Sequence, residues 1–485
     1  MTLPGETRPA AASTLATAQA KVAALLNPRN VVIVGASDAP GSWALRAFQN
    51  LRGYGFPGAV YPVNPRRETV WNMRCYASFA ALPEPPDHVV VVIPAPHVPD
   101  ALREAAAAGA RSATVMSSGF GEASDPAAQA LAETLRRTIA ETGLAVSGPN
   151  CMGNIHAPSR LMTLTDDRPH TIAEGPVAIV AQSGGLAMAI KRTLEERGIV
   201  TASLVTSGNE AGLTSADYIA YYATLPFVHV IVCYLEAVRD PAHLRAACAL
   251  ARAAGKPLAA VKLGASAEGR AAARAHTGGI AGPMEEFDAL AADAGILRLR
   301  TLDDIVEAVE FLTHVPLPAG ARLGGITFSG ALRGLLLDLA AANDLTFPDL
   351  APATRRRLEA VLGVGTFIGN PLDSGFAGLG SKEVYIECVA ALLDDPAVDI
   401  LVLQEELPRG PGSERKEANL HAVNALAPRT HKPIVHITMI SHGVNDYARA
   451  LRAQLPNIGF MQEPDKTLRT VRAIATYAER ARQPA

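Results

Sequence analysis

The stretch VAIVAQSGGLAMAI, at residues 177–190, decides the fold class of this chain. A small and β-branched run is followed by a Gln-Ser-Gly-Gly turn, and an alanine- and leucine-rich segment of helical pattern continues from the turn. A similar order of strand, small-residue turn and helix begins at residue 31 and again at residue 323. Strands that alternate with helices form parallel sheets joined by crossover helices. The sequence therefore predicts an α/β protein.

The same alternation divides the chain into three series of predicted strands, each short and β-branched as buried parallel strands are. The first series has strands at residues 31–34, 59–63, 89–93, 113–116 and 145–146. The second has strands at residues 177–180, 202–205, 228–234 and 258–261, and closes with a helix at 302–312. The third includes strands at residues 323–328, 400–403 and 434–437.

The second and third series both open with a strand, a Ser-Gly turn and a helix, which indicates two flavodoxin-like, doubly wound parallel-sheet domains after a Rossmann-like domain. Residues 315–320 contain two prolines and a glycine and form the expected linker. We expect a mobile tail over residues 1–20. The three domains are expected at residues 21–154, 155–316 and 317–485.

Composition narrows the class of ligand. The 485 residues are 49% hydrophobic and 19% charged, with a formal net charge of -3, so neither nucleic acid nor an anionic membrane is an expected partner. The five cysteines are far apart in sequence, so we predict neither a metal site nor a disulfide framework. We expect no signal peptide and no membrane span, and a cytoplasmic location fits best.

The first series offers a phosphate site at two strand ends. The turn with Gly35, Ser37, Gly41 and Ser42 precedes a predicted helix, and a helix N-terminus attracts phosphate. The second strand ends in Asn64-Pro65-Arg66-Arg67, where an NAD enzyme has an acidic residue, so NAD is disfavoured. Two arginines suit the 3′-phosphate of CoA or the 2′-phosphate of NADP, although solvated surface arginines are an equally simple interpretation.

The Gln182-Ser183-Gly184-Gly185 turn exposes backbone amides at a second predicted helix start, which favours a phosphoryl group. A nucleophile elbow would need glycine where Ala181 stands, so a serine hydrolase is disfavoured. A β-turn without a ligand remains an alternative.

Two further residues have chemistry that the pattern alone leaves open. His276 follows an alanine- and glycine-containing segment and is either a nucleophile or an exposed structural histidine. Glu236 follows a predicted strand and could orient an imidazole or simply point to water.

The order of these motifs resembles that of the NDP-forming (ADP-forming) acyl-CoA synthetases over nearly the whole chain and, more distantly, the α subunit of succinyl-CoA synthetase. The residues that carry the resemblance in the first domain are Asn27-Pro28, residues 34–37 and 58–65, Ser118-Gly119-Phe120-Gly121-Glu122 and residues 148–153. Those in the later domains are residues 182–185, Gly208-Asn209-Glu210 with Asp217, Tyr234-Leu235-Glu236, His276-Thr277-Gly278 and residues 370–373.

The resemblance implies a Rossmann-like CoA-binding domain followed by two flavodoxin-like domains. The implied CoA-binding residues are Gly35, Ser37, Gly41, Ser42, Asn64, Arg66, Arg67, Ile93, Pro94, Ser118 and Gly119. The implied phosphate- and acyl-binding residues are Asn150, Cys151, Gln182, Ser183, Gly184 and Gly185. The implied catalytic residues are His276, which carries a phosphoryl group between an acyl phosphate and ADP, and Glu236, which holds its imidazole in the attacking tautomer.

The resemblance also implies a partner. We recognise no further glycine-rich nucleotide loop with lysine and Mg²⁺-binding carboxylates, so we expect a separate ATP-grasp β subunit to bind ATP or ADP with Mg²⁺. The expected assembly is a hetero-oligomer or a homodimer that acts on a carboxylic acid or an acyl-CoA. The alternatives are a CoA-binding sensor or scaffold without turnover and, more distantly, an NADP-linked oxidoreductase.

Overall fold

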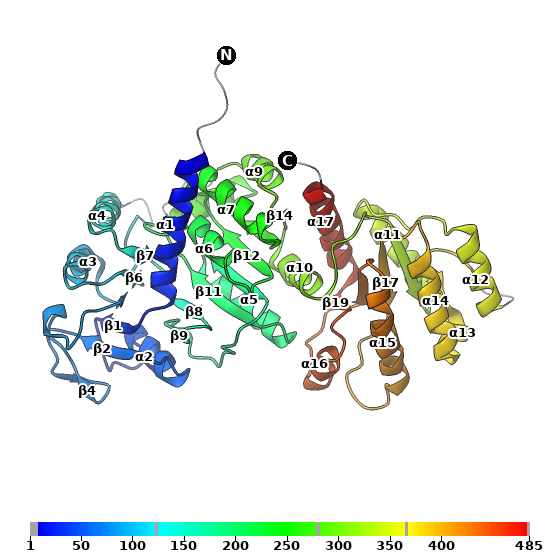
Figure 1. The fold of residues 1–485 in the computed structure, drawn as a ribbon, viewed down its shortest axis with the longest axis horizontal. Helices are drawn as coiled ribbons and strands as arrows, with labels where there is room; N and C mark the ends of the chain where they lie inside the picture. The colour runs from blue at the N-terminus through cyan, green and yellow to red at the C-terminus, as the bar shows by residue number, and fades with distance from the viewer. Residues whose placement is uncertain (1–7, 122–124, 278–281, 364–366, 483–485) are drawn as a thin grey trace, which may run out of the picture. The chain divides into compact units, whose positions relative to one another are not determined.

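The structure, a computed structural model, describes residues 8–121, 125–277, 282–363 and 367–482, without the side chains of residues 8–13, 274–277 and 376. The chain divides into two compact units. Unit 1 comprises Met1–Arg192 and Val200–Ile296, and unit 2 comprises Thr193–Ile199 and Leu297–Ala485. Unit 1 is built around two mainly parallel sheets and unit 2 around one (Figure 1).

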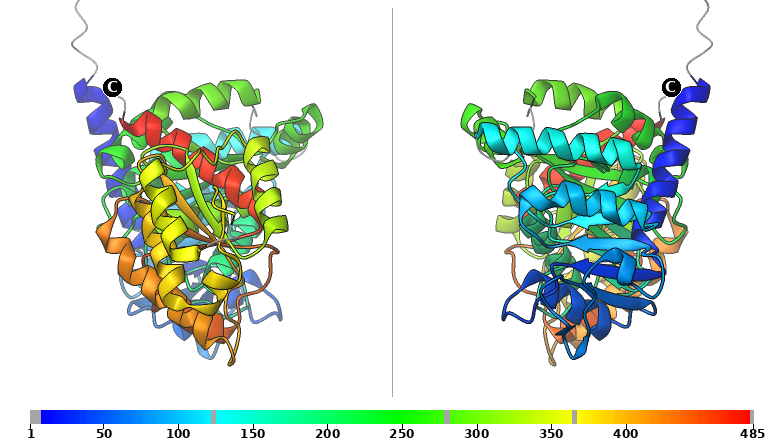
Figure 2. Two further views of the ribbon diagram at one scale, coloured as in Figure 1. Left: turned by 90° about the vertical axis from the view of Figure 1, so that its right-hand side faces the viewer. Right: turned by 90° about the vertical axis from the view of Figure 1, so that its left-hand side faces the viewer.

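The first sheet of unit 1 is parallel, with the strand order β2-β1-β5-β6-β7. Its elements are β1 (Asn30–Val34), α2 (Trp43–Gly53), β2 (Ala59–Val63), β5 (His88–Val91), α3 (Val98–Ala107), β6 (Ser112–Val115), α4 (Pro126–Thr142) and β7 (Ala145–Ser147), with a small hairpin of β3 (Thr69–Val70) and β4 (Met73–Arg74). Every residue of β1 is buried, as expected where helices cover both faces of a parallel sheet. Helices α3 and α4 lie side by side (Figure 2).

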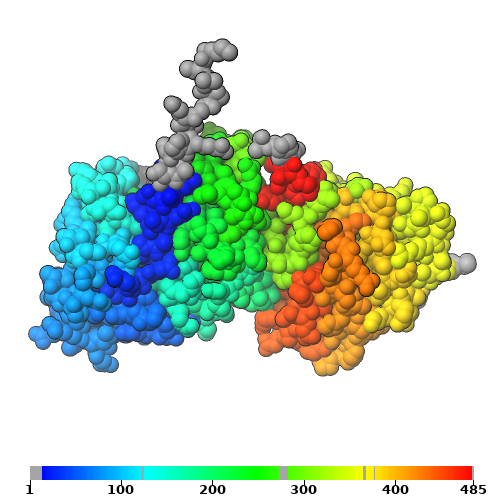
Figure 3. All heavy atoms as spheres, viewed as in Figure 1, coloured from blue at the N-terminus to red at the C-terminus, as the bar shows by residue number. Residues whose placement is uncertain are grey.

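Helix α1 (Arg8–Leu26) is a departure from the expected mobile tail over residues 1–20. Leu15, Val22 and Leu25 are buried, and Nε2 of Gln19 donates a hydrogen bond to the carbonyl oxygen of Ala220 (3.0 Å). Figure 3 shows α1 (dark blue) lying between the cyan and green parts of unit 1. The segment is rich in alanine and has few large apolar residues, so its helical pattern is weak in the sequence, although its leucines and valine are buried in the structure.

Within unit 1, the strands of the second sheet lie in the order β13-β12-β10-β11-β8-β9. Its elements are β8 (Asn154–His156), β9 (Leu161–Met162), β10 (Val177–Ala181), α5 (Gly184–Glu196), β11 (Thr201–Thr206), α6 (Ser215–Tyr222), β12 (Val230–Leu235), α7 (Pro241–Ala253), β13 (Leu258–Lys262), α8 (Ala267–Thr277) and α9 (Met284–Ala294). Strands β10 to β13 are parallel, and β8 and β9 extend the sheet with antiparallel pairing. From β10 the chain passes to β11 on one side of β10, and from β11 it passes to β12 on the other side. A topological switch point therefore lies between β10 and β12.

Unit 2 contains a parallel sheet with the order β16-β15-β17-β18-β19, the same 2-1-3-4-5 order that flavodoxin-like sheets have. Its elements are β14 (Leu297–Arg298), α10 (Leu302–His314), β15 (Leu323–Thr327), α11 (Gly330–Ala342), α12 (Pro352–Leu362), β16 (Leu372–Asp373), α13 (Gly375–Gly380), α14 (Lys382–Asp394), β17 (Ile400–Gln404), α15 (Glu414–Leu426), β18 (Ile434–Thr438), α16 (Asp446–Arg452), β19 (Gly459–Gln462) and α17 (Pro464–Arg482).

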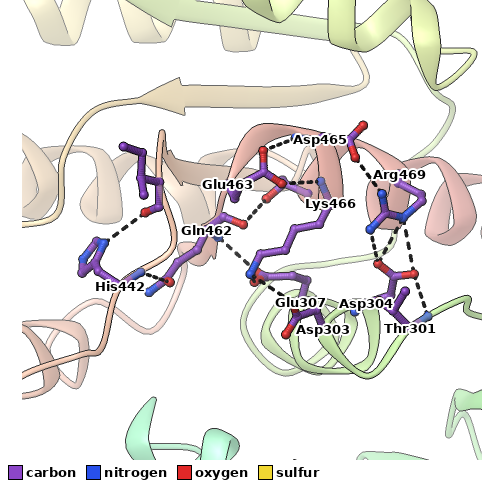
Figure 4. Close-up of polar contacts among 12 residues, drawn as sticks. Thr301, Asp303, Asp304, Glu307, His442, Gln462, Glu463, Asp465, Lys466 and Arg469 are labelled. Carbon is purple, nitrogen blue, oxygen red and sulfur yellow. Dashed lines mark hydrogen bonds and ion pairs between the residues drawn. The ribbon is translucent and has the colours of Figure 1, made fainter.

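Buried carboxylates of α10 close the edge of this third sheet. Glu310 accepts a hydrogen bond from the backbone N–H of Phe460 (3.0 Å), and Glu307 accepts one from that of Gln462 (3.1 Å). Figure 4 shows Glu307 beside Gln462 and Lys466, whose Nζ lies 3.3 Å from the Glu307 carboxylate. Without these contacts the backbone N–H groups of β19, at the edge of the sheet, could pair with another chain. Helix α10 covers this edge and is therefore part of the structure around the third sheet.

The predicted fold class is confirmed, because parallel sheets with crossover helices and flavodoxin-like strand orders are present. The expected boundaries at residues 154 and 316 stay predictions, although α10 groups with unit 2 rather than with the sheet that precedes it. Over the described part of the chain, no helix combines the length and the apolar character needed to cross a membrane.

Candidate active site

The carboxyl ends of β10, β11 and β12 place three polar side chains at one edge of the second sheet. Gln182 follows β10, Glu210 lies in the loop after β11, and Glu236 follows β12. All three are at least nine-tenths buried. Ligands of open α/β sheets bind at this kind of edge, beside the switch point.

Gln182 holds the backbone of Glu236 and Ala237 in place through hydrogen bonds. Its Oε1 accepts hydrogen bonds from the N–H groups of Glu236 (2.6 Å) and Ala237 (2.9 Å), and its Nε2 donates to the carbonyl oxygen of Ala237 (2.8 Å). The side chain thus pairs with the loop in the way that a neighbouring strand would. Glu236 therefore starts from a fixed backbone at the end of β12.

Glu210 is a buried carboxylate surrounded by hydrogen-bond donors. Its Oε1 accepts from Oγ of Ser207 (2.8 Å) and from the N–H (3.0 Å) and Oγ (2.5 Å) of Ser215. Burial raises the pKa of Glu210 above its ordinary value, although hydrogen bonds from Ser215, Gln182 and Ser207 act in the opposite direction. Glu210 itself has a left-handed φ of 53°, so this loop is held in an unusual backbone conformation by its contacts.

The two sheets of unit 1 meet at the loop that follows β7. The N–H group of Asn209 donates a hydrogen bond to the carbonyl oxygen of Pro149 (3.0 Å). The N–H group of Ala211 donates one to the carbonyl oxygen of Gly148 (3.0 Å). Gly208 makes this approach possible, because a Cβ there would lie 2.1 Å from the carbonyl oxygen of Pro149. Asn150 faces the same loop, with its Nδ2 3.4 Å from Oδ1 of Asn209. The predicted acyl-binding loop and the second-sheet edge are therefore in direct contact.

The side chain of Cys151 is buried beside this junction. Its Sγ donates to the carbonyl oxygen of Val115 (3.3 Å), and the side chain is buried. Burial raises the pKa of the thiol to about 12, so it is protonated and unsuited to nucleophilic chemistry. Any contribution of Cys151 to binding would have to come from its backbone.

The predicted phosphate-binding turn begins α5. Ser183 and Gly184 are half-buried, whereas Gly185 is exposed. A Cβ at Gly184 would lie 2.5 Å from Sδ of Met152, whereas one at Gly185 would meet nothing within 4 Å. The open side of the helix N-terminus, where unpaired N–H groups favour an anion, is therefore at Gly185.

His276 lies near the C-terminal end of α8, on the chain that continues from the carboxyl end of β13. Its side chain, like the motif residue Gly278, lies outside the described residues. Gly282, the next residue that the structure describes after Thr277, has its carbonyl oxygen 3.4 Å from Nζ of the buried Lys262. The connection from β13 thus starts at the same sheet edge as Glu236.

The residues predicted to bind CoA all follow strands of the first sheet. Gly35, Ser37, Gly41 and Ser42 follow β1, Asn64, Arg66 and Arg67 follow β2, Ile93 and Pro94 follow β5, and Ser118 and Gly119 follow β6. Because parallel strands share a direction, the structure brings this set to one edge. Gly35, with φ of 87°, lies so close to β5 that a Cβ would be 2.1 Å from the carbonyl oxygen of Val92.

Local contacts order the loop after β2. Asn64 donates through Nδ2 to the carbonyl oxygen of Ala36 (2.8 Å), and its Oδ1 accepts from the N–H of Arg66 (2.9 Å). The guanidinium of Arg67 lies 3.4 Å from the carboxylate of Asp38, and both side chains are substantially exposed. The two arginines predicted to hold a phosphate thus border the β1 loop, one of them through an ion pair.

Three residues outside the predicted site set border the second-sheet edge. Glu210 fills its centre, Lys262 ends β13, and Nη2 of Arg239 donates to the carbonyl oxygen of Asn209 (2.6 Å). The sequence signal for Glu210 and Lys262 is a charged residue at or just after a β-branched run. Arg239 has no such signal, because its position depends on how the β12 loop folds.

Comparison with known proteins gives this site a class. Residues 29–157 match a CoA binding domain, and residues 174–312 match a succinyl-CoA ligase-like flavodoxin domain. The two matched segments hold the first-sheet edge and the second-sheet edge, respectively. The fold and site therefore define a CoA ligase of the succinyl-CoA ligase type.

The relatives identify the family more narrowly. The chain is 30% identical to subunit alpha of the ADP-forming acetate–CoA ligase II of Pyrococcus furiosus, over 88% of this chain and 91% of the relative. It is 34% identical to a trans-feruloyl-CoA synthase from an unidentified prokaryote, over 78% of this chain but only 54% of that protein. The chain belongs to the family of ADP-forming CoA ligase α subunits, which confirms the resemblance inferred from its motifs.

A solved structure agrees with this assignment. The acetyl-coenzyme A synthetase 1 of Ca. Korarchaeum cryptofilum, described as dinucleotide forming and in complex with phosphate and ADP, is similar with a TM-score of 0.80 and 26% identity. The match covers 95% of this chain and 97% of the other.

Proposed function

We propose that this chain is the CoA-binding, phosphohistidine-carrying subunit of an ADP-forming acyl-CoA synthetase. The observation that carries the proposal is the second-sheet edge, where the buried Glu236, the start of α5 and the strand that leads to His276 meet. A carboxylate beside an imidazole fixes its tautomer and stabilises its charged form. The helix start supplies N–H groups for a phosphoryl group.

In the direction of acid activation, a ring nitrogen of His276 forms a bond to the γ-phosphorus of ATP and ADP leaves. A carboxylate oxygen of the substrate then attacks that phosphorus, the P–N bond breaks, and an acyl phosphate forms. The CoA thiolate attacks the acyl carbon, and phosphate leaves as the thioester forms. Asn150 and the α5 start are the proposed contacts for the acyl phosphate. The relatives named for acetate and ferulate support a carboxylic acid as substrate.

CoA is proposed to lie along the first-sheet edge, with its 3′-phosphate at Arg66 and Arg67. This placement is supported by the match of residues 29–157 to a CoA binding domain and by the exposure of both arginines. Calorimetry with CoA and dephospho-CoA tests it, and equal affinity for the two would remove the role of the arginines.

We further propose an ATP-grasp β subunit that holds ATP or ADP with Mg²⁺, in a cytoplasmic hetero-oligomer. Support comes from the names of two relatives, which are α subunits of ADP-forming ligases. The chain spans about half of several other relatives, including the trans-feruloyl-CoA synthase.

The test of the proposed function is a screen of carboxylic acids for ADP release that requires CoA, Mg²⁺ and the candidate β subunit. Turnover that requires this chain would support the proposal. CoA binding by this chain without turnover for any acid, while the same β subunit turns over with another α subunit, would instead favour a CoA sensor or scaffold.

A further inference from the structure

We propose that Gln182 is a positioning residue, which sets the Glu236 carboxylate for His276 and does not itself contact the phosphoryl group. This inference rests on the proposed function of His276. It departs from the sequence-based assignment of Gln182 to phosphate binding.

The argument begins with the hydrogen-bonding capacity of an amide side chain. A glutamine has two acceptor sites on Oε1 and two donor hydrogens on Nε2. Both acceptor sites of Gln182 are used by the N–H groups of Glu236 and Ala237, and one donor hydrogen is used by the carbonyl oxygen of Ala237. The pattern also fixes the amide orientation, because a reversed amide would face two N–H groups with its own NH₂.

The amide of Gln182 also influences a second buried carboxyl group, that of Glu210. Gln182 is among the hydrogen-bond donors that lower the pKa of Glu210, against the larger effect of burial. Gln182 is 3% exposed, and Glu210 is 6% exposed. The amide is therefore buried, and three of its four hydrogen-bonding positions are already used by the loop after β12, so at most one donor hydrogen could reach an incoming phosphate.

The contacts explain why this position needs an amide. The β12 loop turns away from the sheet after Leu235, so Glu236 and Ala237 lose the strand partners that their backbone groups would otherwise have. Gln182 replaces those partners, and the backbone from which the Glu236 side chain extends is therefore fixed. Displacement of a catalytic group by about 1 Å can lower a rate about 10²-fold, so a small change at Gln182 is expected to reach His276.

The first variant, Gln182→Leu, removes every polar contact while keeping a similar volume. The assay is the half-reaction of this chain alone, in which an acyl-CoA and labelled inorganic phosphate produce label on His276. We expect the rate to fall about 10²-fold with the KM for phosphate unchanged. A raised KM for phosphate with an unchanged maximal rate would overturn the proposal, because it would mean that Gln182 binds phosphate.

The second variant, Gln182→Glu, keeps the acceptor sites and makes the donor dependent on pH. At pH 8 its carboxylate faces the carbonyl oxygen of Ala237, which repels it, so the rate should be low. On acidification the new carboxyl group takes up a proton and can donate to Ala237 again. We therefore expect its rate, relative to wild type at the same pH, to rise as the pH falls.

These variants separate the inference from the proposed function. CoA affinity, measured by calorimetry, should be unchanged in both variants because the CoA-binding set lies on the first sheet. If Gln182→Leu does not fold, the pH profile of Gln182→Glu decides, and a rate ratio that does not change with pH overturns the proposal. If wild type acquires no label while it turns over with a β subunit, the proposed function fails instead.

Discussion

Gly208 shows how much of the candidate site depends on single residues. It has a φ of 57°, and its α-carbon faces the carbonyl oxygen of Pro149 so closely that no side chain fits. The next residues, Asn209 and Glu210, carry the contacts to the β7 loop and to the buried serines. One backbone position therefore couples the proposed acyl-binding loop to the carboxylates of the second sheet.

Gly208→Ala tests this coupling. A Cβ in the left-handed region, pressed against a backbone oxygen, is expected to lower the free energy of unfolding by about 1–3 kcal/mol and to move Glu210. The matched control is Gly185→Ala in the first turn of α5, where the added Cβ meets nothing within 4 Å. The control should be neutral or more stable by up to about 1 kcal/mol. Denaturant unfolding measures both, and equal effects would contradict the account.

At the scale of elements, buried ion pairs hold α10 within unit 2. Arg197 forms a two-point contact with Glu307 (3.1 and 2.6 Å), and Arg452 pairs with Glu310. Burial would raise the pKa of Glu310, but Arg452, followed by His314 and Arg197, holds it below its ordinary value. Removal of one partner from such a pair leaves an uncompensated buried charge.

Arg452→Met is therefore expected to lower the free energy of unfolding by about 3–5 kcal/mol at pH 7. The control is Arg449→Met on the same helix, α16. Arg449 is partly exposed, pairs with the exposed Asp446 and donates to the carbonyl oxygen of Glu196 (2.7 Å), and solvent-exposed contacts of this kind contribute about 1 kcal/mol or less each. Since the pKa of Glu310 is lowered in the folded state, its contribution is present above the ordinary carboxyl pKa and is lost as the pH falls through the folded value. The difference between wild type and Arg452→Met should shrink on acidification in that window.

A histidine–aspartate pair links α6 to α7, and its contribution to stability depends on pH in the opposite direction. Nε2 of His243 lies 2.9 Å from Oδ1 of Asp217, and this hydrogen bond raises the pKa of His243 above its ordinary value of 6.5. The stabilisation is complete below pH 6.5 and is lost as the pH rises through the folded pKa. An NMR titration should place the pKa of His243 above 6.5 in wild type and lower in Asp217→Asn. An unchanged pKa in that variant would show that the pair is not its cause.

At the scale of the whole molecule, the parallel sheets were predictable because their strands are nearly continuous apolar runs. The sequence-based strands at 59–63 and 323–328 agree with β2 and β15 within a residue. Strands β8, β9 and β16 have only two or three residues and no pattern of their own. The association of α10 with unit 2 could not be predicted from the sequence either. It depends on hydrogen bonds from backbone groups about 150 positions away to the carboxylates of Glu307 and Glu310.

The candidate site divides in the same way. Strand ends and glycine turns can be read from sequence, so the positions of Glu236 and the Ser183 turn at the ends of β12 and β10 were predictable, while their roles stay predictions. The hydrogen-bond partners of an amide side chain depend on how the loops around it fold. The contacts of Gln182 and the burial of the Cys151 thiol could therefore not be predicted from the sequence. Sequence reasoning thus located the edges of the sheets but not the direction in which each side chain on them points.

The most direct test of the central claim is phosphorylation of His276. The chain is incubated with labelled ATP, Mg²⁺ and an ATP-grasp β subunit, and the label is tested for acid lability, which phosphohistidine has. The account predicts acid-labile label on wild type, none on His276→Asn, and strongly slowed labelling of Glu236→Gln. Label that persists on His276→Asn, or turnover with CoA and acid while His276 stays unlabelled, would contradict it.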